Sequence, residues 1–353
     1  MPVPIAADDI VRTWAEAGEN GRAPLVVLEP LIEFLDANGL GSGDARLEPI
    51  GDGRSNVTYL VERGDASFVL RRPPRPPWPP SAHDVVREAR VLRALEGRAR
   101  VPKVHAVCEA EAVIGAPFYV MELIEGDVIR DQVPEGLDRR RAAESLVDAL
   151  VELHALDWRA AGLSEIGKPD GYLERQVRRF QDVWEQTKTR EIPAVELVGA
   201  WLADSLPASP APTLVHGDYR LGNAVVRGSN VVAILDWEMA TVGDPLADLG
   251  YLCATWSDRD DGERAMFEPS PATRDQGFLR RPELVARYEE RSGRPMTDIR
   301  WYQTLALWKA AVFMEGNYRR AVSGATDDDF LASFGDGVLQ LAHRAKALAV
   351  GLQ

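Results

Sequence analysis

Cysteine is nearly absent from this sequence of 353 residues, since it occurs only at Cys108 and Cys253, without CxxC spacing. Two distant cysteines argue against a disulfide framework and favour free thiols in a reducing compartment. No apolar run approaches the ~20 residues that a membrane-spanning helix requires. Residues 1–9 also lack the basic and apolar pattern of a signal peptide. These absences predict a soluble, cytoplasmic protein that is not embedded in a membrane.

Acidic residues outnumber basic ones. Lysine and arginine number 41 against 55 aspartates and glutamates, a formal net charge of −14. Nucleic acids and anionic membranes need clustered basic residues, so neither is expected as a partner. An acidic surface fits a cationic substrate and a merely soluble protein equally well, and therefore selects no substrate. The chain length and a hydrophobic content of 45% predict a globular protein with two domains or one two-lobed domain.

The first third of the chain has the pattern of a β-sheet. Residues 57–61 and 67–71 are rich in β-branched and aromatic residues and flank a Gly64-Asp65 turn, which predicts a hairpin. Residues 101–107 and 118–123 are further strand candidates, and an early helix is expected to end near Asn38-Gly39. After Gly126 long helical patterns dominate. We therefore predict an α+β protein with a β-rich N-terminal lobe (1–124) and a mostly helical C-terminal lobe (125–353).

Three polar residues follow short apolar strands in the helical half. Asp218 comes after residues 213–215, Asn223 lies five residues further on, and Asp236 ends the apolar run 231–235. A kinase needs an aspartate to orient the substrate hydroxyl and accept its proton, and oxygen ligands for Mg²⁺ on the nucleotide phosphates. A strand–turn–strand over this distance can bring the three side chains to one strand-end cluster. The spacing predicts a phosphoryl-transfer site.

Each of these residues also has an ordinary structural interpretation. Asp218 and Asn223 are common turn formers, and Asp236 can cap a helix. For the three together, at the ends of apolar strands, the catalytic interpretation is the stronger one. A metal-dependent phosphoesterase is a further alternative, but the five histidines are scattered along the chain, which argues against a His-rich dimetal site.

The motifs around these residues occur in a fixed order: His216-Gly217-Asp218 with Asn223, then Asp236-Trp237-Glu238, then Gly243-Asp244-Pro245 with Asp248-Leu249. With them the sequence resembles the aminoglycoside phosphotransferase superfamily, whose members share the protein-kinase fold. The resemblance extends from about residue 31 to about residue 348. Within the superfamily the chain is similar to the branch that includes kinase domains fused to acyl-CoA dehydrogenases, through segments 81–84, 172–176, 277–279 and 309–319.

The resemblance implies a bilobal, protein-kinase-like fold and gives the three polar residues their roles. Asp218 would be the catalytic base, and Asn223 and Asp236 would hold Mg²⁺. Asp248 would be a buried residue that orients the catalytic loop. A cap on the helix that starts near Pro245 is an equally good interpretation of Asp248 and is compatible with the first.

The same resemblance assigns the nucleotide, ATP or GTP, to the N-terminal lobe. A loop before the strand at 57–61 would cover the phosphates, through the candidate contacts Gly51, Gly53, Ser55 and Asn56. Glycines let backbone N–H groups approach phosphate oxygens closely. Residues 121–124 match the hinge, where backbone groups of Glu122 and Ile124 would bind adenine.

One position departs from the kinase pattern. Kinases pair a strand lysine with a helix glutamate to hold the α- and β-phosphates, but here the strand ends in Arg71-Arg72 and the helix offers Glu88. Arginine is always charged and can bind phosphate bidentately, so the role can be kept. Strand alternation leaves Arg72 on the opposite face, and Arg71 is therefore the expected phosphate contact.

The acceptor pocket is expected in the helical half, within reach of Asp218. Its candidate contacts lie on two predicted helices and are Tyr172, Gln176, Lys309, Glu315 and Arg319. Lys309 and Arg319 suit an anionic group, although such residues are more often simply solvated. Glu315 lies inside an apolar helix, where a buried carboxylate needs a partner.

Two further groups bear on the acceptor. The tryptophans at 237, 256, 301 and 308 either line an apolar cavity or pack in the core. Aminoglycoside enzymes use acidic pockets, but the acidic residues at 258–263 are better interpreted as an exposed loop.

The leading hypothesis is a Mg²⁺-dependent kinase that transfers the γ-phosphoryl group of ATP or GTP to a small-molecule hydroxyl. The resemblance favours a hydroxyacyl-CoA-like or other metabolite over an aminoglycoside. The alternative is a catalytically weak nucleotide-binding module, suggested by Arg71, although the intact Asp218 argues against it. Protein phosphorylation is disfavoured because no Asp-Phe-Gly or Ala-Pro-Glu segment occurs.

Overall fold

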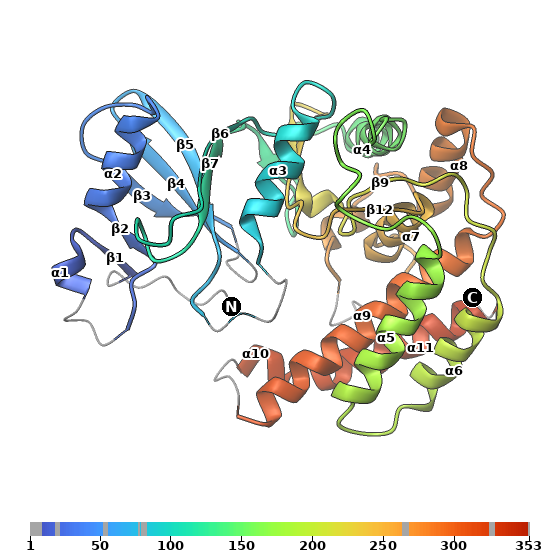
Figure 1. Ribbon diagram of the computed structural model, residues 1–353. Coiled ribbons are helices and arrows are strands. Elements are labelled where there is room, and N and C mark those ends of the chain that lie inside the picture. The colour runs from blue at the N-terminus through green and yellow to red at the C-terminus, as the bar shows by residue number, and fades with distance from the viewer. Residues whose placement is uncertain are drawn as a thin grey trace. The chain divides into compact units, whose positions relative to one another are not determined.

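A computed structural model describes residues 9–17, 22–51, 56–76, 78, 83–262, 268–324 and 329–351 (Figure 1). The chain forms two compact units. The first comprises Met1–Glu125 together with Asp236–Glu238, and the second comprises Gly126–Leu235 together with Met239–Gln353. The first unit is built on a β-sheet and the second is mostly helical, so the predicted α+β class is confirmed.

A five-stranded antiparallel sheet forms the centre of the first unit. Its strands follow the order β3 (Arg46–Pro49), β4 (Val57–Arg63), β5 (Ala66–Arg72), β7 (Phe118–Glu122) and β6 (Val104–Cys108). Strands β4 and β5 are the predicted hairpin, and Gly64 in its turn has a φ of 57°, which glycine adopts without strain. The register pairs Leu70 with Tyr59 and Val120, and all three side chains are fully buried in the core.

Two helices pack on this sheet. Helix α2 (Leu28–Ala37) buries Leu31 and Leu35 in the same apolar core and ends at Asn38-Gly39, as predicted. Helix α3 (Val85–Leu95) contacts β6 and β7, and its first turn is capped by Asp84, whose Oδ1 accepts the N–H of Arg87 at 2.9 Å. The short elements β1 (Ile10–Val11), α1 (Trp14–Ala17) and β2 (Val26–Val27) precede α2, and the parallel pairing of β1 with β2 was not predicted.

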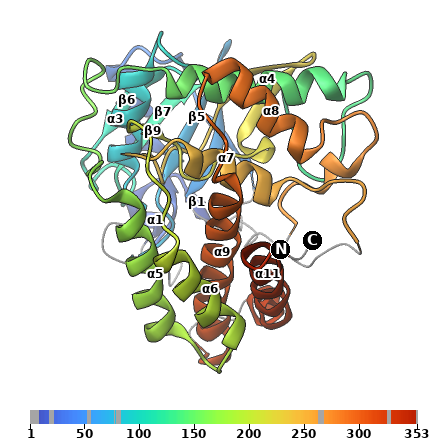
Figure 2. The same cartoon turned by 90° about the vertical axis from the view of Figure 1, so that its right-hand side faces the viewer.

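The second unit places helices around short strands. The helices are α4 (Arg139–His154), α5 (Tyr172–Thr187), α6 (Pro193–Asp204), α7 (Leu246–Thr255), α8 (Arg281–Ser292), α9 (Ile299–Val322), α10 (Asp329–Ala332) and α11 (Phe334–Ala349). The strands are β8 (Asp127–Val128), β9 (Thr213–Val215), β10 (Ala224–Arg227), β11 (Asn230–Ile234) and β12 (Thr241–Gly243), in the orders β11-β10-β8 and β12-β9. Figure 2 shows α5, α6, α9 and α11 side by side, in agreement with their mutual contacts.

Helix α9 contacts α5, α6, α7, α10 and α11. A Cβ at Gly250 of α7 would lie 2.7 Å from the carbonyl carbon of Tyr302, so α7 and α9 approach this closely only because Gly250 has no side chain. Trp301 and Trp308 of α9 are buried and donate to the carbonyls of Leu202 and Val195. These tryptophans are therefore core residues, which favours packing over the alternative of an apolar cavity lining. Among the described residues no helix is long and apolar enough to span a membrane.

Candidate active site

The loop between β9 and β10 brings Asp218 and Asn223 together. It includes a short 3₁₀ turn, Leu221–Asn223, and enters β10 at Ala224. The Asn223 Nδ2 donates to the Asp218 carboxylate Oδ2 at 2.7 Å and to the Asp218 carbonyl at 2.9 Å. The Asp218 side chain remains 23% exposed and is therefore accessible to solvent. The contact predicted from the five-residue spacing is present within the second unit.

A buried carboxylate on α7 holds the start of this loop. The Asp248 Oδ2 accepts the His216 N–H at 2.7 Å, and its Oδ1 accepts the Gly217 N–H at 2.8 Å. The His154 Nε2 lies 3.2 Å from the same Oδ2, and Asp248 is fully buried. A buried carboxylate is tolerated when it accepts this many hydrogen bonds. The geometry matches the loop-orienting role that the resemblance implied.

The helix cap proposed as the other role of Asp248 belongs to Asp244 instead. The Asp244 Oδ1 accepts the Leu246 N–H at 2.9 Å, at the first residue of α7. Its Oδ2 accepts the hydroxyl of Tyr302 at 2.7 Å. Burial raises the pKa of Asp244, and the hydrogen bond from Tyr302 works against that rise. Asp244 therefore caps the first turn of α7, whereas both carboxylate oxygens of Asp248 bind the loop.

The His216 ring contacts backbone groups of the loop and of the segment before Asp236. Its Nδ1 lies 3.2 Å from the backbone N of Asp218, and its Nε2 lies 2.9 Å from the carbonyl of Leu235. An N–H that donates to Nδ1 requires a lone pair there, so this pattern places the ring proton on Nε2, which donates to Leu235. The Leu235 N–H in turn donates to the Asn223 carbonyl at 2.8 Å. The ring thus links the Asp218–Asn223 loop to the end of the strand that precedes Asp236 in the chain.

Arg220 also lies in the candidate site and was not predicted from the sequence. Its Nε lies 3.4 Å from the Asp218 Oδ1. A Cβ at Gly222 would lie 2.4 Å from one guanidinium nitrogen, so a side chain there would displace Arg220. The only signal in the sequence was a cation two residues after the aspartate, inside the loop, and the motif leaves that position unspecified.

In the first unit, Arg71 forms an ion pair with two carboxylates. Its Nε donates to Glu88 at 2.9 Å, and its terminal nitrogen donates to the Asp236 Oδ1 at 2.6 Å. Burial lowers the pKa of Arg71, but Glu88 and then Asp236 more than offset this, and the net pKa is raised. The second oxygen of Glu88 accepts the Trp237 N–H at 3.1 Å. Glu88 thus holds both Arg71 and the backbone beside Asp236, which has a φ of 66°.

The loop expected to cover the phosphates is described only at its two ends. Gly53 and Ser55 lie outside the described residues. Gly51 has a φ of 80°, a conformation that favours glycine. The side chain of Asn56 is buried, and its Nδ2 lies 3.3 Å from the Glu238 Oε2. This side chain therefore anchors the end of the loop.

The predicted hinge residues follow the end of β7. The Glu122 N–H donates to the carbonyl of Lys103 at 2.8 Å, and its carboxylate accepts the Lys103 N–H at 3.2 Å. An adenine contact through Glu122 has to use another group of this residue. Ile124 lies two residues beyond, outside the strand.

Two of the five candidate acceptor contacts meet in the second unit. The Lys309 Nζ on α9 donates to the Gln176 Oε1 on α5 at 2.9 Å and lies 4.7 Å from the ring centroid of Phe180. Burial, together with the nearby charge of Arg179, lowers the pKa of Lys309 to about 8. Among the described residues no carboxylate lies within ion-pair distance of this ammonium group. Its direct partners, Gln176 and Phe180, are neutral, and the charge of Asp248 offsets only part of the fall in pKa.

The other three candidates have structural contacts. The ring of Tyr172 packs against Gly243, where a Cβ would lie 2.5 Å from it. Arg319 donates to the Gln186 carbonyl. The Glu315 Oε1 accepts the N–H and the hydroxyl of Thr189 at 2.9 and 2.6 Å, which supplies the partner that its burial requires. These contacts hold the α5–α6 connection and α5 in place, so they give no support to acceptor roles for these three residues.

The expectation of an exposed acidic loop at 258–263 is wrong for two of its residues. Asp258 and Asp261 both contact Arg281, and the side chain of Asp258 is only 13% exposed. The N–H of Arg281 also donates to the Asp258 Oδ1 at 3.1 Å. Arg281, at the start of α8 and about twenty residues away in sequence, pairs with both carboxylates and reduces their exposure to solvent. Asp260 alone among the described acids of this loop remains largely exposed.

The Asp218–Asn223 loop, the buried carboxylate of Asp248 and the Arg71–Glu88 pair can be compared with known proteins. The model of the family described as "Phosphotransferase enzyme family" matches residues 46–303. The chain belongs to the phosphotransferase enzyme family. This confirms the family predicted from the motifs. It also agrees with the predicted enzyme class of this phosphotransferase, one with an alcohol group as acceptor.

The curated relatives of this phosphotransferase come from the predicted branch. Acyl-CoA dehydrogenase family member 10 of Mus musculus is 34% identical over 296 residues, which cover 80% of this chain and 27% of that protein. Acyl-CoA dehydrogenase family member 11 of Gallus gallus is 31% identical over 320 residues, which cover 87% of this chain and 41% of that protein. The phosphotransferase chain therefore spans less than half the length of these relatives.

Solved structures support the fold of the phosphotransferase. A crystal structure from Ralstonia eutropha, described as an aminoglycoside phosphotransferase, is 29% identical with a TM-score of 0.76 and covers 92% of this chain and 98% of its own. Spectinomycin phosphotransferase, solved with ADP and spectinomycin, is 11% identical with a TM-score of 0.62 and covers 91% of this chain and 99% of its own. The second likeness concerns the fold alone.

Proposed function

We propose that this phosphotransferase transfers the γ-phosphoryl group of ATP or GTP to the hydroxyl of a small molecule. The observation that carries the proposal is the Asp218–Asn223 pair, joined at 2.7 Å on a loop whose backbone is bound by the buried Asp248. Such a pair suits a base that must sit at one fixed place beside an incoming hydroxyl. Asp218 accepts the hydroxyl proton, the hydroxyl oxygen bonds to the γ-phosphorus, and the bond to the nucleoside diphosphate breaks.

The donor atoms of Asn223 and Asp236 suit Mg²⁺ as the cofactor. The Asn223 Nδ2 donates twice to Asp218, which leaves the amide oxygen Oδ1 to serve as a cation ligand. Asp236 offers a carboxylate that is 25% exposed. Mg²⁺ prefers hard oxygen donors and takes its remaining ligands from phosphates and water. When bound, the ion supplies neutralisation of the charge on the transferred phosphoryl group.

The nucleotide is proposed to contact Arg71, which Glu88 holds at 2.9 Å, together with the loop that begins at Gly51. A guanidinium offers several donors in a planar fork, so it can keep its carboxylate partner and still donate to a phosphate oxygen. Backbone groups of Glu122 and Ile124 remain the proposed adenine contacts.

The acceptor is proposed to be a hydroxyacyl-CoA-like or other anionic metabolite. The names of the relatives, members of the acyl-CoA dehydrogenase family, favour an acyl-CoA-type compound. The ammonium group of Lys309 favours an anion, because its direct partners Gln176 and Phe180 are neutral and it has no carboxylate at ion-pair distance among the described residues. A polycationic aminoglycoside would be repelled by such a group.

The test is a screen of hydroxyacyl-CoAs, sugars and aminoglycosides for nucleotide consumption and a phosphorylated product. Asp218→Asn removes the base and should lower kcat by about 10²–10⁴ with any acceptor that is used. Asp204→Asn makes the same chemical change at the exposed end of α6 and should leave kcat unchanged. If no acceptor raises turnover above that of Asp218→Asn, the kinase proposal fails.

A nucleotide-binding module without transferase activity is the second candidate, since Arg71 stands where kinases carry lysine. Calorimetric titration with ATP and Mg²⁺ separates the two when it is combined with the screen. Tight nucleotide binding without product from any acceptor favours the module. Binding with product favours the kinase.

A further inference from the structure

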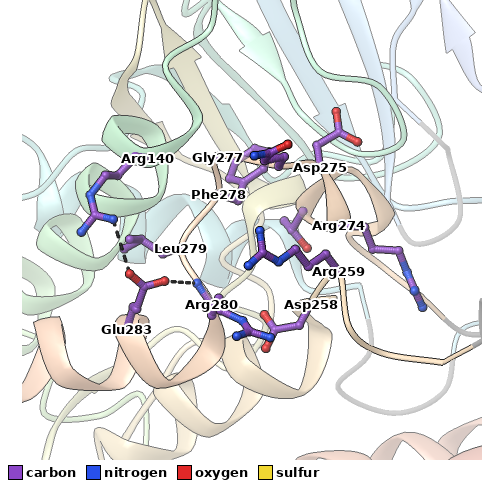
Figure 3. Close-up of a pocket in the computed structure, with 12 residues that line it drawn as sticks. Arg140, Asp258, Arg259, Arg274, Asp275, Gly277, Phe278, Leu279, Arg280 and Glu283 are labelled. Atoms are coloured by element: carbon purple, nitrogen blue, oxygen red, sulfur yellow. Dashed lines mark hydrogen bonds and ion pairs between the residues drawn. The ribbon is translucent and has the colours of Figure 1, made fainter.

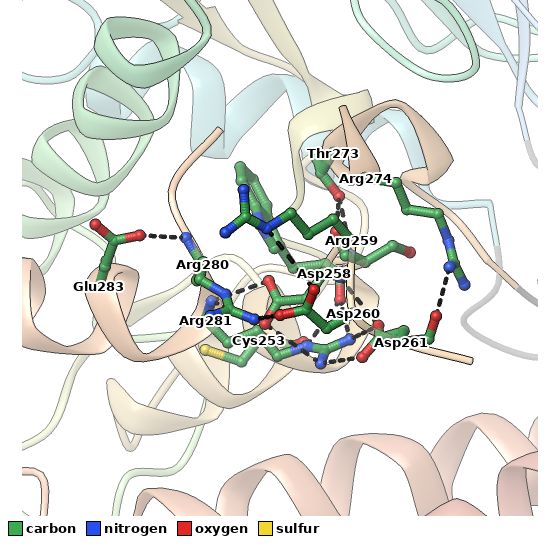
Figure 4. Close-up of polar contacts among 12 residues, drawn as sticks. Cys253, Asp258, Arg259, Asp260, Asp261, Thr273, Arg274, Arg280, Arg281 and Glu283 are labelled. Carbon is green, nitrogen blue, oxygen red and sulfur yellow. Dashed lines mark hydrogen bonds and ion pairs between the residues drawn. The ribbon is translucent and has the colours of Figure 1, made fainter. Parts of the chain in front are cut away.

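Four arginines line a pocket of about 280 Å³ in the second unit (Figure 3), and their charges are matched by carboxylates. The pairs are Arg140 with Glu144 and Glu283, Arg274 with Glu268, and Arg259 and Arg280 with Asp260. The neighbouring Arg281 faces Asp258 and Asp261 (Figure 4). Mutual neutralisation of charge therefore explains this cluster without a ligand.

A strained residue of the first unit has a different character. His83 precedes Asp84, the cap of α3, and has a φ of 60°, a conformation that favours glycine. Among the described residues, His83 and Asp236 are the two non-glycine residues with a positive φ. Strain of this kind persists only where the surroundings hold it, and it is concentrated at functional sites. Since glycine would fit this backbone without strain, the imidazole ring is the feature that needs an explanation.

The His83 ring contacts Asn56, at the end of the loop that is expected to cover the phosphates. Its Nδ1 lies 3.2 Å from the Asn56 Oδ1, and the Asn56 Nδ2 lies 3.3 Å from the Glu238 Oε2. An ionised carboxylate can only accept hydrogen bonds, so the amide nitrogen of Asn56 faces Glu238 and the amide oxygen faces His83. The His83 Nδ1 therefore carries a proton and donates it to Asn56.

The side chain of Asn56 is fully used by these two contacts. Its oxygen accepts from His83, its nitrogen donates to Glu238, and the residue is only 4% exposed. A buried amide is favourable when both of its ends have partners. The side chain thus serves as a link between His83 and Glu238 rather than as a phosphate contact of its own.

The link ends in the segment that contains Asp236. The first turn of α3 already holds this segment by its backbone, since Glu88 accepts the Trp237 N–H at 3.1 Å and Arg87 donates to the Glu238 carbonyl at 3.2 Å. The link from the imidazole ring adds a hold on the Glu238 side chain. All of these residues belong to the first unit. The start of α3 therefore positions both the end of the phosphate loop and the chain beside the proposed Mg²⁺ ligand.

We propose that His83 is a positioning residue for the phosphoryl donor. Through Asn56 it fixes the end of the 51–56 loop against the Asp236–Glu238 segment, so that the nucleotide meets both in a preformed arrangement. The inference rests on the proposed function, because it takes the 51–56 loop to cover the nucleotide phosphates. It adds a residue that acts through Asn56 and not on the nucleotide itself.

The binding test titrates the full chain with a non-hydrolysable analogue of ATP or GTP in the presence of Mg²⁺. His83→Ala removes the ring and keeps the strain, whereas His83→Gly removes both, and each should raise the Kd about tenfold through the lost hydrogen bond. His83→Asn tolerates a positive φ and places an amide N–H near the position of Nδ1, so its Kd should stay within about twofold of wild type. Arg90→Gln, at an exposed position of α3, should leave the Kd unchanged.

Urea unfolding of the same variants separates positioning from a purely structural role. His83→Gly should unfold at a higher urea concentration than His83→Ala, because glycine relieves the strain. If His83 acts through the ring, the Kd is raised equally in the two variants in spite of this difference. A Kd that returns to the wild-type value in His83→Gly but not in His83→Ala would overturn the proposal, and so would an unchanged Kd in both.

A double variant tests the link through Asn56. Asn56→Ala should raise the Kd about tenfold, and His83→Gly added to it should raise the Kd no further, because the two changes break one connection. A rise of about 100-fold in the double variant would show independent effects and refute the link. If the wild type binds neither nucleotide analogue, the proposed function fails and this inference with it. Wild-type binding that His83→Gly leaves unchanged overturns the inference alone.

Discussion

Replacing Asp248 by asparagine tests whether this carboxylate holds the catalytic loop in its active shape. Its two oxygens accept the N–H groups of Gly217 and His216 at 2.8 and 2.7 Å, and His154 lies against one of them. Asparagine keeps one acceptor oxygen, but its NH₂ group then faces a backbone N–H donor. The variant therefore leaves a buried donor without an acceptor and removes the charge from the remaining contacts.

The magnitude follows from these contacts. A hydrogen bond to a charged acceptor contributes about 1.5–3 kcal/mol, and a buried donor left without a partner costs about 1–3 kcal/mol. We expect Asp248→Asn to lower the free energy of unfolding by about 3 kcal/mol, a large fraction of the ~5–15 kcal/mol typical of a folded protein. Because Gly217 directly precedes Asp218, a loosened loop should misplace the base. A displacement of about 1 Å lowers kcat by about 100-fold.

The assay combines urea unfolding, followed by tryptophan fluorescence, with kcat and KM for ATP under saturating acceptor. Asp244→Asn is the matched control, because Asp244 is equally buried but bonds to Leu246 and Tyr302 instead of the loop. The control should lose stability and keep most of its kcat. Equal losses of kcat in the two variants, or a kcat of Asp248→Asn near the wild-type value, would refute the reasoning.

Two further predictions concern the cations of the two units. Arg71→Lys keeps the charge but replaces the planar fork, in which two separate nitrogens bind Glu88 and Asp236, by one ammonium nitrogen that cannot hold both contacts in the same geometry. The kcat/KM for ATP should therefore fall about tenfold, against 100-fold or more for Arg71→Met. A wild-type kcat/KM in Arg71→Lys would show that the two-nitrogen geometry contributes nothing. The pKa of Lys309 is lowered to about 8, so the charged form is lost above that pH, and KM for an anionic acceptor should rise there in wild type but stay constant in Lys309→Met. In the unfolded chain the lysine keeps its proton up to about pH 10.5. The free energy of unfolding of the wild type, relative to that of Lys309→Met, should therefore increase from pH 8 to pH 10.5 in urea unfolding experiments. A decrease over this range would contradict the lowered pKa of Lys309.

The features predicted well are those that depend on short stretches of chain. The β4–β5 hairpin follows from alternation and a Gly64-Asp65 turn, and the register then places Arg71 and Arg72 on opposite faces. Arg72 indeed donates to backbone carbonyls in the core of the first unit, whereas Arg71 pairs with Glu88. The Asp218–Asn223 contact was predictable for the same reason, since a tight loop of five residues leaves few arrangements.

The features that were missed or predicted wrongly depend on side chains far apart in sequence. Glu315 looked like a ligand contact because its burial required a partner, but its partners are Thr189, 126 residues earlier, and the neighbouring Arg190. Asp258 and Asp261 looked solvated because nothing local marks Arg281 as their partner. A long arginine side chain can reach in many directions, and only the packed helices α7 and α8 select one of them.

The ion pair between Arg71 and Asp236 shows most clearly where local reasoning ends. The motifs assigned the two residues separate tasks, a phosphate contact and a cation ligand, and no pattern relates positions 165 residues apart. Asp236 adopts a φ of 66°, a conformation that costs a non-glycine residue about 1–3 kcal/mol and persists only where neighbours hold it. Glu88 supplies that hold by binding both Arg71 and the Trp237 N–H. The sequence therefore predicts which residues bear charge, and the packing of α3 on the sheet determines which charges meet.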